Sequence, residues 1–191
     1  MSTNSVVAYL NEDGSVVSSY VHYDGYETGV GMMLLEHYNT DKCARDLAST
    51  LGYASSLSET VAESHADRVH TDEPETFESM EEFELYLMDN SHLEFGYLWT
   101  GGKWMVASWT TTVEGTGPYA EYNSTWNGFH WLVTSFVREG RKTVDRFRDR
   151  ALEDNREGRT EYDEFADEME VVVDKWHRYG MGEIATEAMA A

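Results

Sequence analysis

The residues best suited to chemistry lie in one glycine-punctuated loop, His22-Tyr23-Asp24-Gly25-Tyr26-Glu27-Thr28-Gly29, at the end of an expected strand. Histidine titrates near neutral pH, so His22 could act as a general acid or base, with Asp24 orienting its ring. The simpler interpretation is structural: Asp24-Gly25 forms a turn, and Tyr23 and Tyr26 pack beside it as anchors. His22, Tyr23, Asp24 and Tyr26 are therefore a candidate ligand-binding or interaction loop, and no residue is assigned as catalytic.

The second candidate site is a run of carboxylates between residues 72 and 94, which hold nine aspartates and glutamates and no lysine or arginine. Ser79-Met80-Glu81-Glu82 is typical of a capping box and predicts that a helix begins there. Carboxylates on its exposed side would imitate phosphates in front of the basic cleft of a DNA-binding protein. Alternatively they form a solvated helix face, because Phe83 and Leu87 take the buried side. The candidate partner-binding residues are Glu75, Glu78, Glu81, Glu82 and Glu84.

One segment is basic in a chain whose formal net charge is −22. Residues 128–150 hold three acidic and six basic residues, whereas the segments on either side are acidic. The basic stripe, formed by Arg138, Arg141, Lys142 and Arg148, could bind an acidic partner or the acidic surface of a second copy. The alternative is internal pairing, both with the acidic last helix and with acidic residues one turn away on the same helix, such as Asp145. Each exposed ion pair of this kind contributes only about 0.2–1 kcal/mol.

Other kinds of site find no support in the sequence. Cys43 is the only cysteine, so no intramolecular disulfide can form, and its expected place is the buried side of a helix. No HxxxH or HExxH pair is present, so neither a metal nor another cofactor is expected. The negative charge repels phosphates and anionic lipids, which argues against direct nucleic-acid or membrane partners. Without a leader or a long apolar run, the protein is expected in the cytoplasm.

Two hairpins are expected to carry these sites. Asp13-Gly14 and Gly101-Gly102 are two-residue turn signals between strand-like runs. The predicted strand pairs are Val6–Leu10 with Ser15–His22, and Glu94–Thr100 with Lys103–Trp109. Short helices are expected over 30–51 and 79–89, and 53–76 is expected to be a loop with a short strand near Val69.

From about residue 128 the apolar spacing becomes helical. The predicted class is therefore α+β: an antiparallel sheet of four or five strands, built from two hairpins with short packed helices, plus a C-terminal helical pair. We expect a domain over residues 1–110 and a helical extension over 111–191 packed on it, or one continuous domain.

The C-terminal helices carry two apolar stripes. The first holds Phe129, Trp131, Leu132, Phe136, Val137, Val144 and Phe147, and the second holds Tyr162, Phe165, Met169, Val172, Val173 and Trp176. An antiparallel sheet usually buries one face and wets the other, so these stripes offer more apolar surface than one chain covers. The prediction is a C2 homodimer through residues 128–178, and the alternative is a monomer whose helices cover the second sheet face.

Several motifs of the first half occur in an order that resembles a known family. They are Tyr9-Leu10-Asn11-Glu12-Asp13-Gly14-Ser15-Val16, Tyr20 to Tyr26, Gly29-Val30-Gly31 with Leu34-Leu35-Glu36-His37-Tyr38, Leu51 to Leu57, and Gly102-Lys103-Trp104-Met105-Val106. The order resembles a family of small bacteriophage and prophage proteins of unknown function, and the resemblance covers about residues 5–107. It implies a phage-encoded accessory protein in the host cytoplasm and brings no catalytic residue with it.

Charge and resemblance together suggest three kinds of function. The first is a non-enzymatic accessory protein that binds a host protein with a basic surface, such as a nucleic-acid-binding or defence factor that it masks by charge mimicry. The second is a small-ligand binder or enzyme that uses the His22–Asp24 loop. The third is a component of the virion or of its assembly.

Overall fold

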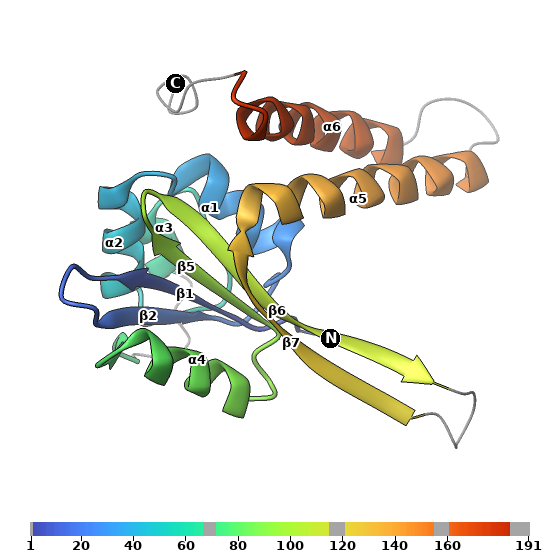
Figure 1. Ribbon diagram of the computed structural model, residues 1–191. Coiled ribbons are helices and arrows are strands. Elements are labelled where there is room, and N and C mark those ends of the chain that lie inside the picture. Colours follow the sequence, from blue (N-terminus) through green and yellow to red (C-terminus); the bar gives the residue numbers. More distant parts are fainter. Residues whose placement is uncertain (1, 67–71, 115–120, 155–160, 184–191) are drawn as a thin grey trace.

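The structure is a computed structural model that describes residues 2–66, 72–114, 121–154 and 161–183 (Figure 1). Its strands are β1 Ser5–Leu10, β2 Val16–Val21, β3 Tyr53–Ala54, β4 Glu75–Phe77, β5 Phe95–Thr100, β6 Lys103–Glu114 and β7 Glu121–Trp131. Its helices are the π-helical turn η1 Glu27–Gly31, α1 Met32–His37, α2 Asp41–Thr50, α3 Val61–Ala66, α4 Met80–Asp89, α5 Leu132–Asp154 and α6 Glu161–Gly180. This mixture of helices and strands confirms the α+β class.

Two glycine turns set the strand pairs at the centre of the sheet. β1 and β2 run antiparallel, from Ser5 opposite Val21 to Leu10 opposite Val16, and Gly14 between them has a φ of +89°. β5 and β6 also run antiparallel, and both residues of their turn, Gly101 and Gly102, have positive φ. Glycine adopts this left-handed backbone without steric cost, which explains why it stands at each turn.

The sheet is mixed, so the prediction of an antiparallel sheet is wrong. The strand order is β3-β2-β1-β5-β6-β7, with β4 paired to β2 on the same side as β3. β1 pairs parallel with β5, and β2 pairs parallel with β3. β5 can lie parallel to β1 because the connection between the two hairpins is long. A crossover that contains helices can return the chain in the same direction.

Residues 53–76 are not the loop that the sequence predicts. They include β3, α3 and β4, and the strand expected near Val69 lies outside the described residues. β3 pairs with one half of β2, and β4 pairs with the other half. Strands of two and three residues are too short to show a periodic pattern, so the sequence gives no signal for them.

The expected helix at residue 128 begins later, because β7 occupies Glu121–Trp131. β7 pairs antiparallel with β6 up to Glu114 opposite Glu121, and the hairpin projects well beyond the rest of the sheet (Figure 1). Phe129 and Trp131, which were predicted on a helical stripe, are therefore strand residues. The predicted domain boundary at residue 110 falls inside β6, so the sheet continues across it.

Helices cover both faces of this sheet. Tyr9, Tyr97 and Trp104 point to one face, where the core is completed by side chains of α1, α2, α5 and α6. Val6 and Leu98 point to the other face and pack against α4. Figure 1 shows α4 alone on its side of the sheet and the other helices on the opposite side.

The C-terminal helices pack lengthwise against each other and onto the first of these faces (Figure 1). The stripe side chains Leu132, Phe136, Val173 and Trp176 are at most 1% exposed within the single chain. Glu36 of α1 accepts hydrogen bonds from Lys175 and Trp176, which ties α6 to the N-terminal half. The apolar surface that suggested a homodimer is thus largely covered by the chain itself.

Candidate functional site

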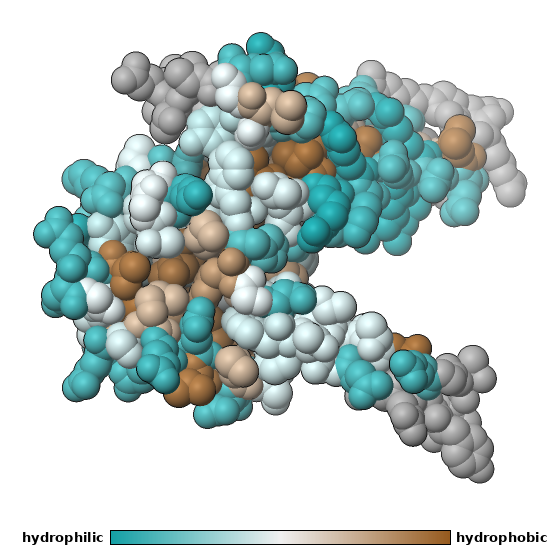
Figure 2. Space-filling model, in the orientation of Figure 1, coloured by the Kyte–Doolittle hydropathy of each residue, from teal (hydrophilic) through white to brown (hydrophobic). Residues whose placement is uncertain are grey.

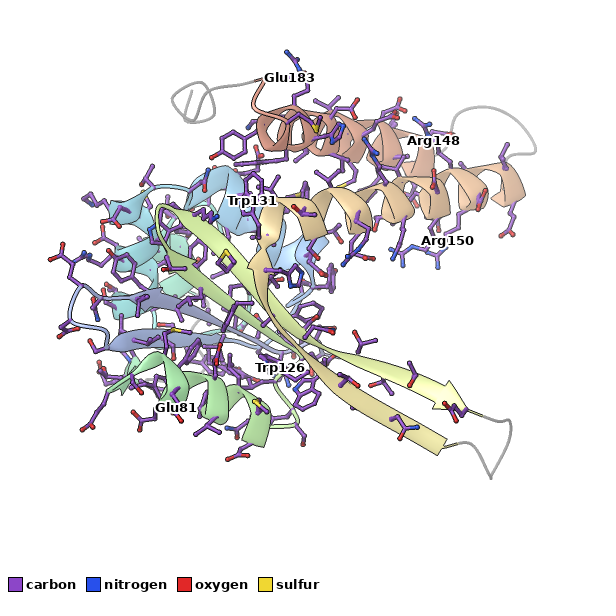
Figure 3. The ribbon with its side chains drawn as sticks, viewed as in Figure 1. Glu81, Trp126, Trp131, Arg148, Arg150 and Glu183 are labelled. Carbon is purple, nitrogen blue, oxygen red and sulfur yellow. The ribbon has the colours of Figure 1, made fainter. Side chains whose placement is uncertain are left out.

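The predicted acidic residues lie together on β4 and α4. Ser79 caps α4, because its Oγ accepts a hydrogen bond from the Glu82 amide at 3.2 Å. Phe83 and Leu87 are fully buried, so the carboxylates must take the other sides of the helix. The exposed acidic residues are Glu75, Glu78, Glu81 and Glu82, and Glu84 is half-buried. Glu81 projects from the outer side of α4 (Figure 3).

No base in the described part of the chain pairs with these carboxylates. In the described ranges, none of the nine acidic side chains between residues 72 and 94 forms an ion pair. Their hydrogen bonds are local: Glu82 accepts from the Glu78 amide at 2.6 Å, and Glu75 accepts from the Tyr86 hydroxyl. The surface formed by Glu75, Glu78, Glu81, Glu82 and Glu84, called the acidic surface below, therefore keeps its negative potential.

Two large apolar side chains lie exposed among these charges. Leu85 is 52% exposed and Met88 is 44% exposed. They are three residues apart on α4, so they share one side of the helix. Over this part of the molecule, hydrophobic residues gather between hydrophilic ones (Figure 2). An apolar centre with a charged rim is the usual anatomy of a protein–protein interface.

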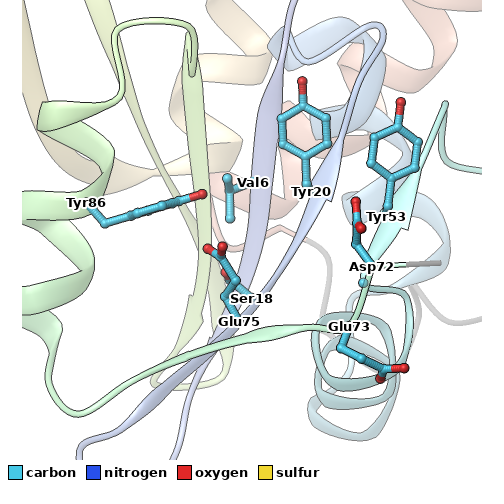
Figure 4. Close-up of a pocket in the computed structure, with 9 residues that line it drawn as sticks. Val6, Ser18, Tyr20, Tyr53, Asp72, Glu73, Glu75 and Tyr86 are labelled. Atoms are coloured by element: carbon cyan, nitrogen blue, oxygen red, sulfur yellow. The ribbon is translucent and has the colours of Figure 1, made fainter. Parts of the chain in front are cut away.

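A cavity of about 260 Å³ opens beside the acidic surface. Its lining comes from β1, β2, β3, β4 and α4 and from the segments next to them: Val6, Ser18, Tyr20, Gly52, Tyr53, Asp72, Glu73, Glu75 and Tyr86. Figure 4 shows Tyr20 and Tyr53 side by side, with Tyr86 reaching across from α4. The sequence gives no signal for this cavity, because its three tyrosines are far apart along the chain.

The tyrosine rings of this cavity are held in place. Tyr20 and Tyr53 stack with ring centroids 5.4 Å apart and planes inclined by 26°. Burial, together with the nearby Glu75 carboxylate, raises the pKa of the Tyr86 hydroxyl far above its ordinary value. The three phenols therefore stay protonated near neutral pH, and the cavity carries only the charges of its carboxylates.

The His22 loop is fastened as a turn. The Gly25 amide donates to the Thr3 carbonyl at 2.8 Å, and the Gly25 carbonyl accepts from the buried Tyr97 hydroxyl at 2.8 Å. A Cβ on Gly25 would lie 2.6 Å from the Thr3 oxygen, so this position has room only for glycine. Asp24, with a φ of +58°, stands at the tip of the turn.

The loop does not join its histidine to its carboxylate. His22 Nδ1 lies 3.2 Å from the Tyr20 hydroxyl, whereas Asp24 accepts a hydrogen bond from the Tyr26 hydroxyl at 3.0 Å. Tyr23 and Tyr26, expected as packed anchors, are 47% and 40% exposed. The arrangement provides a surface turn with two exposed phenols, and Asp24 does not orient His22.

Glu27 follows the loop and was not predicted as a site residue. Its carboxylate is 8% exposed and accepts from Ser135 Oγ of α5 at 2.7 Å, and Arg138 donates to the same Oγ at 3.1 Å. A cavity of about 420 Å³ lies beside it, between η1 and the α5–α6 pair, with Arg146 and Phe165 in its lining. A buried carboxylate needs such partners, so this contact joins the loop to α5.

The basic stripe is mostly paired within the chain. Glu139 accepts hydrogen bonds from Arg138 at 2.8 Å and Lys142 at 2.9 Å. Burial alone would raise the pKa of the Glu139 carboxyl, but these two bases hold it below its ordinary value. Arg148 lies on the α6 side of α5 and pairs with Glu170 (Figure 3). Of the stripe, Arg141 alone forms no ion pair with a described residue.

Two further features concern ligands and membranes. Within the described ranges, no three histidine, cysteine, aspartate or glutamate side chains are grouped so that they could hold a metal ion. None of the helices in the same ranges has the length and apolar character needed to span a membrane.

No protein-family model, curated protein or solved structure matches this chain.

Proposed function

We propose that the protein is a phage-encoded accessory protein that binds a host protein with a basic surface in the host cytoplasm. The observation that carries this proposal is the acidic surface itself, where unpaired carboxylates surround the exposed Leu85 and Met88. The resemblance of residues 5–107 to small phage proteins supports the phage origin. An enzyme that uses His22 and Asp24 as an acid–base pair is not favoured, because Asp24 accepts from Tyr26 and His22 contacts Tyr20.

Charge and apolar contacts would have different roles in this binding. Unpaired carboxylates attract a basic partner over a distance and speed its association, while buried apolar side chains hold the complex together. A partner that normally binds nucleic acid has its cations arranged for phosphates, and a row of carboxylates presents a comparable pattern. This is the basis for proposing a nucleic-acid-binding or defence factor as the partner, masked by charge mimicry.

Neutralising three carboxylates tests the proposal. We expect Glu78→Gln, Glu81→Gln and Glu84→Gln together to reduce the amount of partner captured from host lysate at least about tenfold. Glu82 is left unchanged because its carboxylate bonds the Glu78 amide at the start of α4. The measurement is quantitative mass spectrometry of captured proteins at about 0.1 M salt, where charges still act over about 10 Å.

The matched control changes the same number of charges elsewhere. Glu161→Gln, Glu164→Gln and Glu168→Gln lie on exposed positions of α6 and leave the acidic surface intact. A protein that binds through the acidic surface is captured by this control as well as by the unchanged protein. Equal capture by both triple variants, or no protein enriched over a blank resin, contradicts the proposal.

The homodimer through residues 128–178 stays a prediction. Because the stripe side chains are largely buried in one chain, a dimer would have to use apolar side chains of α5 and α6 that stay exposed, such as Leu152, Phe165 and Val171. Light scattering at micromolar concentration distinguishes the two states. A mass of twice 21.8 kDa supports the dimer, and a mass of 21.8 kDa contradicts it.

A further inference from the structure

The tyrosine-lined cavity combines aromatic rings with three carboxylates that no base among the described residues pairs with. Tyr20 and Tyr53 form one wall as a stacked pair, and Tyr86 forms another from α4. Figure 4 shows the Glu75 carboxylate between these walls and the Asp72 carboxylate next to Tyr53. The remaining floor includes Val6, which is 1% exposed.

Aromatic faces and carboxylates attract the same kind of ligand. The face of a phenol ring carries partial negative charge, so it attracts a cation placed over it, and the attraction grows as water is removed. The three carboxylates of the lining, Asp72, Glu73 and Glu75, form no ion pair among the described residues. An anion would be repelled here, whereas a cation is attracted both by the rings and by the carboxylates.

The hydrogen-bonding groups of the lining favour one class of cation. Glu75 and Asp72 supply carboxylate oxygens, and the Ser18 hydroxyl and the phenol oxygens supply further acceptors. A guanidinium group has five N–H donors in a plane, binds carboxylates with two parallel hydrogen bonds and stacks on aromatic rings. An ammonium group has three donors and no flat face, so it uses less of this lining.

We propose that the tyrosine-lined cavity binds a guanidinium group, supplied by an arginine side chain of the partner protein. The cavity shares Glu75 with the acidic surface, so a basic protein seated on that surface would bring its arginines to the cavity mouth. The source of the arginine rests on the proposed function, whereas the chemistry of the cavity does not.

The test uses a small probe and no partner protein. N-acetyl-L-argininamide is titrated into the ¹⁵N-labelled full-length chain, and the backbone amide shifts are followed by NMR. The comparison ligand is N-acetyl-L-citrullinamide, which has nearly the same shape but carries a neutral urea group. We expect the arginine probe to shift amides around Tyr20, Tyr53, Glu75 and Tyr86, and the citrulline probe to leave them unchanged.

Two variants assign this binding to the cavity. Glu75→Gln removes one carboxylate and Tyr53→Leu removes one ring, and each is expected to weaken binding of the arginine probe about five- to tenfold. Glu78→Gln is the matched control, because Glu78 belongs to the acidic surface but does not line the cavity. Its affinity for the probe is expected to equal that of the unchanged protein.

Three outcomes would overturn the proposal: equal shifts from the citrulline probe, unchanged affinity in both cavity variants, or shifts confined to other parts of the chain. The two proposals can fail separately. If the arginine probe does not bind, only the cavity proposal is contradicted. The capture experiment on Glu78, Glu81 and Glu84 still tests the proposed function. Conversely, probe binding in the cavity together with unchanged capture by that triple variant contradicts only the acidic surface as the partner site.

Discussion

Replacing Phe136 by alanine is expected to lower the free energy of unfolding by about 3–5 kcal/mol. The Phe136 ring is 0% exposed and lies in the same core cluster as Leu34, Tyr97 and Trp104. Removing it leaves a cavity where α5 meets the sheet, and close-packed surroundings collapse only partly into such a space. Because that core includes residues on both sides of position 110, the loss should appear in one transition of the whole chain.

Chemical denaturation followed by tryptophan fluorescence and by far-UV circular dichroism measures this loss. Trp99 and Trp104 report on the sheet and Trp176 reports on α6, while the dichroism is dominated by the helices. Phe165→Ala is the matched control: its ring is 42% exposed on α6, and we expect it to cost about 1 kcal/mol or less. If Phe136→Ala unfolds α5 and α6 and leaves the sheet folded, the helical pair unfolds as a separate unit and the prediction is wrong.

Local signals in the sequence predict the parts of this fold that local forces determine. The Asp13-Gly14 and Gly101-Gly102 turns need backbone conformations that glycine adopts freely, so they can be recognised from neighbouring residues alone. Ser79 at the start of α4 is recognisable for the same reason, because its hydrogen bond reaches only to residue 82. The apolar spacing of Phe83 and Leu87 then fixes which side of α4 is buried.

Pairings between distant segments were not predictable in this way. Whether β5 lies beside β1 depends on the path of the intervening residues 11–94, which no local pattern describes. The sequence does not reveal β7, because its aromatic residues Phe129 and Trp131 also suit a helix that continues into Leu132. A short apolar run indicates that a segment is buried, but it does not distinguish a strand from a helix.

In the candidate site, too, local features could be predicted and contacts between distant segments could not. The carboxylates of α4 are adjacent in sequence, so their common surface could be predicted from charge and helical spacing. The pairs of the basic stripe are of the two kinds that the alternative interpretation names: Arg148 pairs with α6, and Arg138 and Lys142 pair with Glu139 of their own helix. Tyr20, Tyr53 and Tyr86 meet only because β2, β3 and α4 are brought together by the sheet.

Gly140 is where sequence and structure lead to opposite expectations. In the interior of a helix, alanine is ordinarily more stable than glycine by about 1 kcal/mol, so Gly140→Ala would be expected to stabilise α5. In the structure, a Cβ at this position would lie 2.4 Å from Cγ2 of Val173 on α6. Val173 is 1% exposed and its branched side chain has few alternative rotamers. We therefore expect Gly140→Ala to destabilise the protein by about 1–3 kcal/mol.

A double-mutant cycle separates this steric cause from other effects of the substitution. Val173→Ala alone removes two buried methyl groups and should cost roughly 2 kcal/mol. In the double variant, the new methyl group at 140 occupies part of the space that Val173 leaves. The combined loss should therefore be smaller than the sum of the single losses by about 1 kcal/mol or more. Denaturant unfolding of the four proteins measures all the terms. Additive losses would show that the free-energy cost of Gly140→Ala does not come from contact with Val173. A Gly140→Ala variant more stable than the unchanged protein would show that α5 and α6 can accommodate the methyl group at no cost.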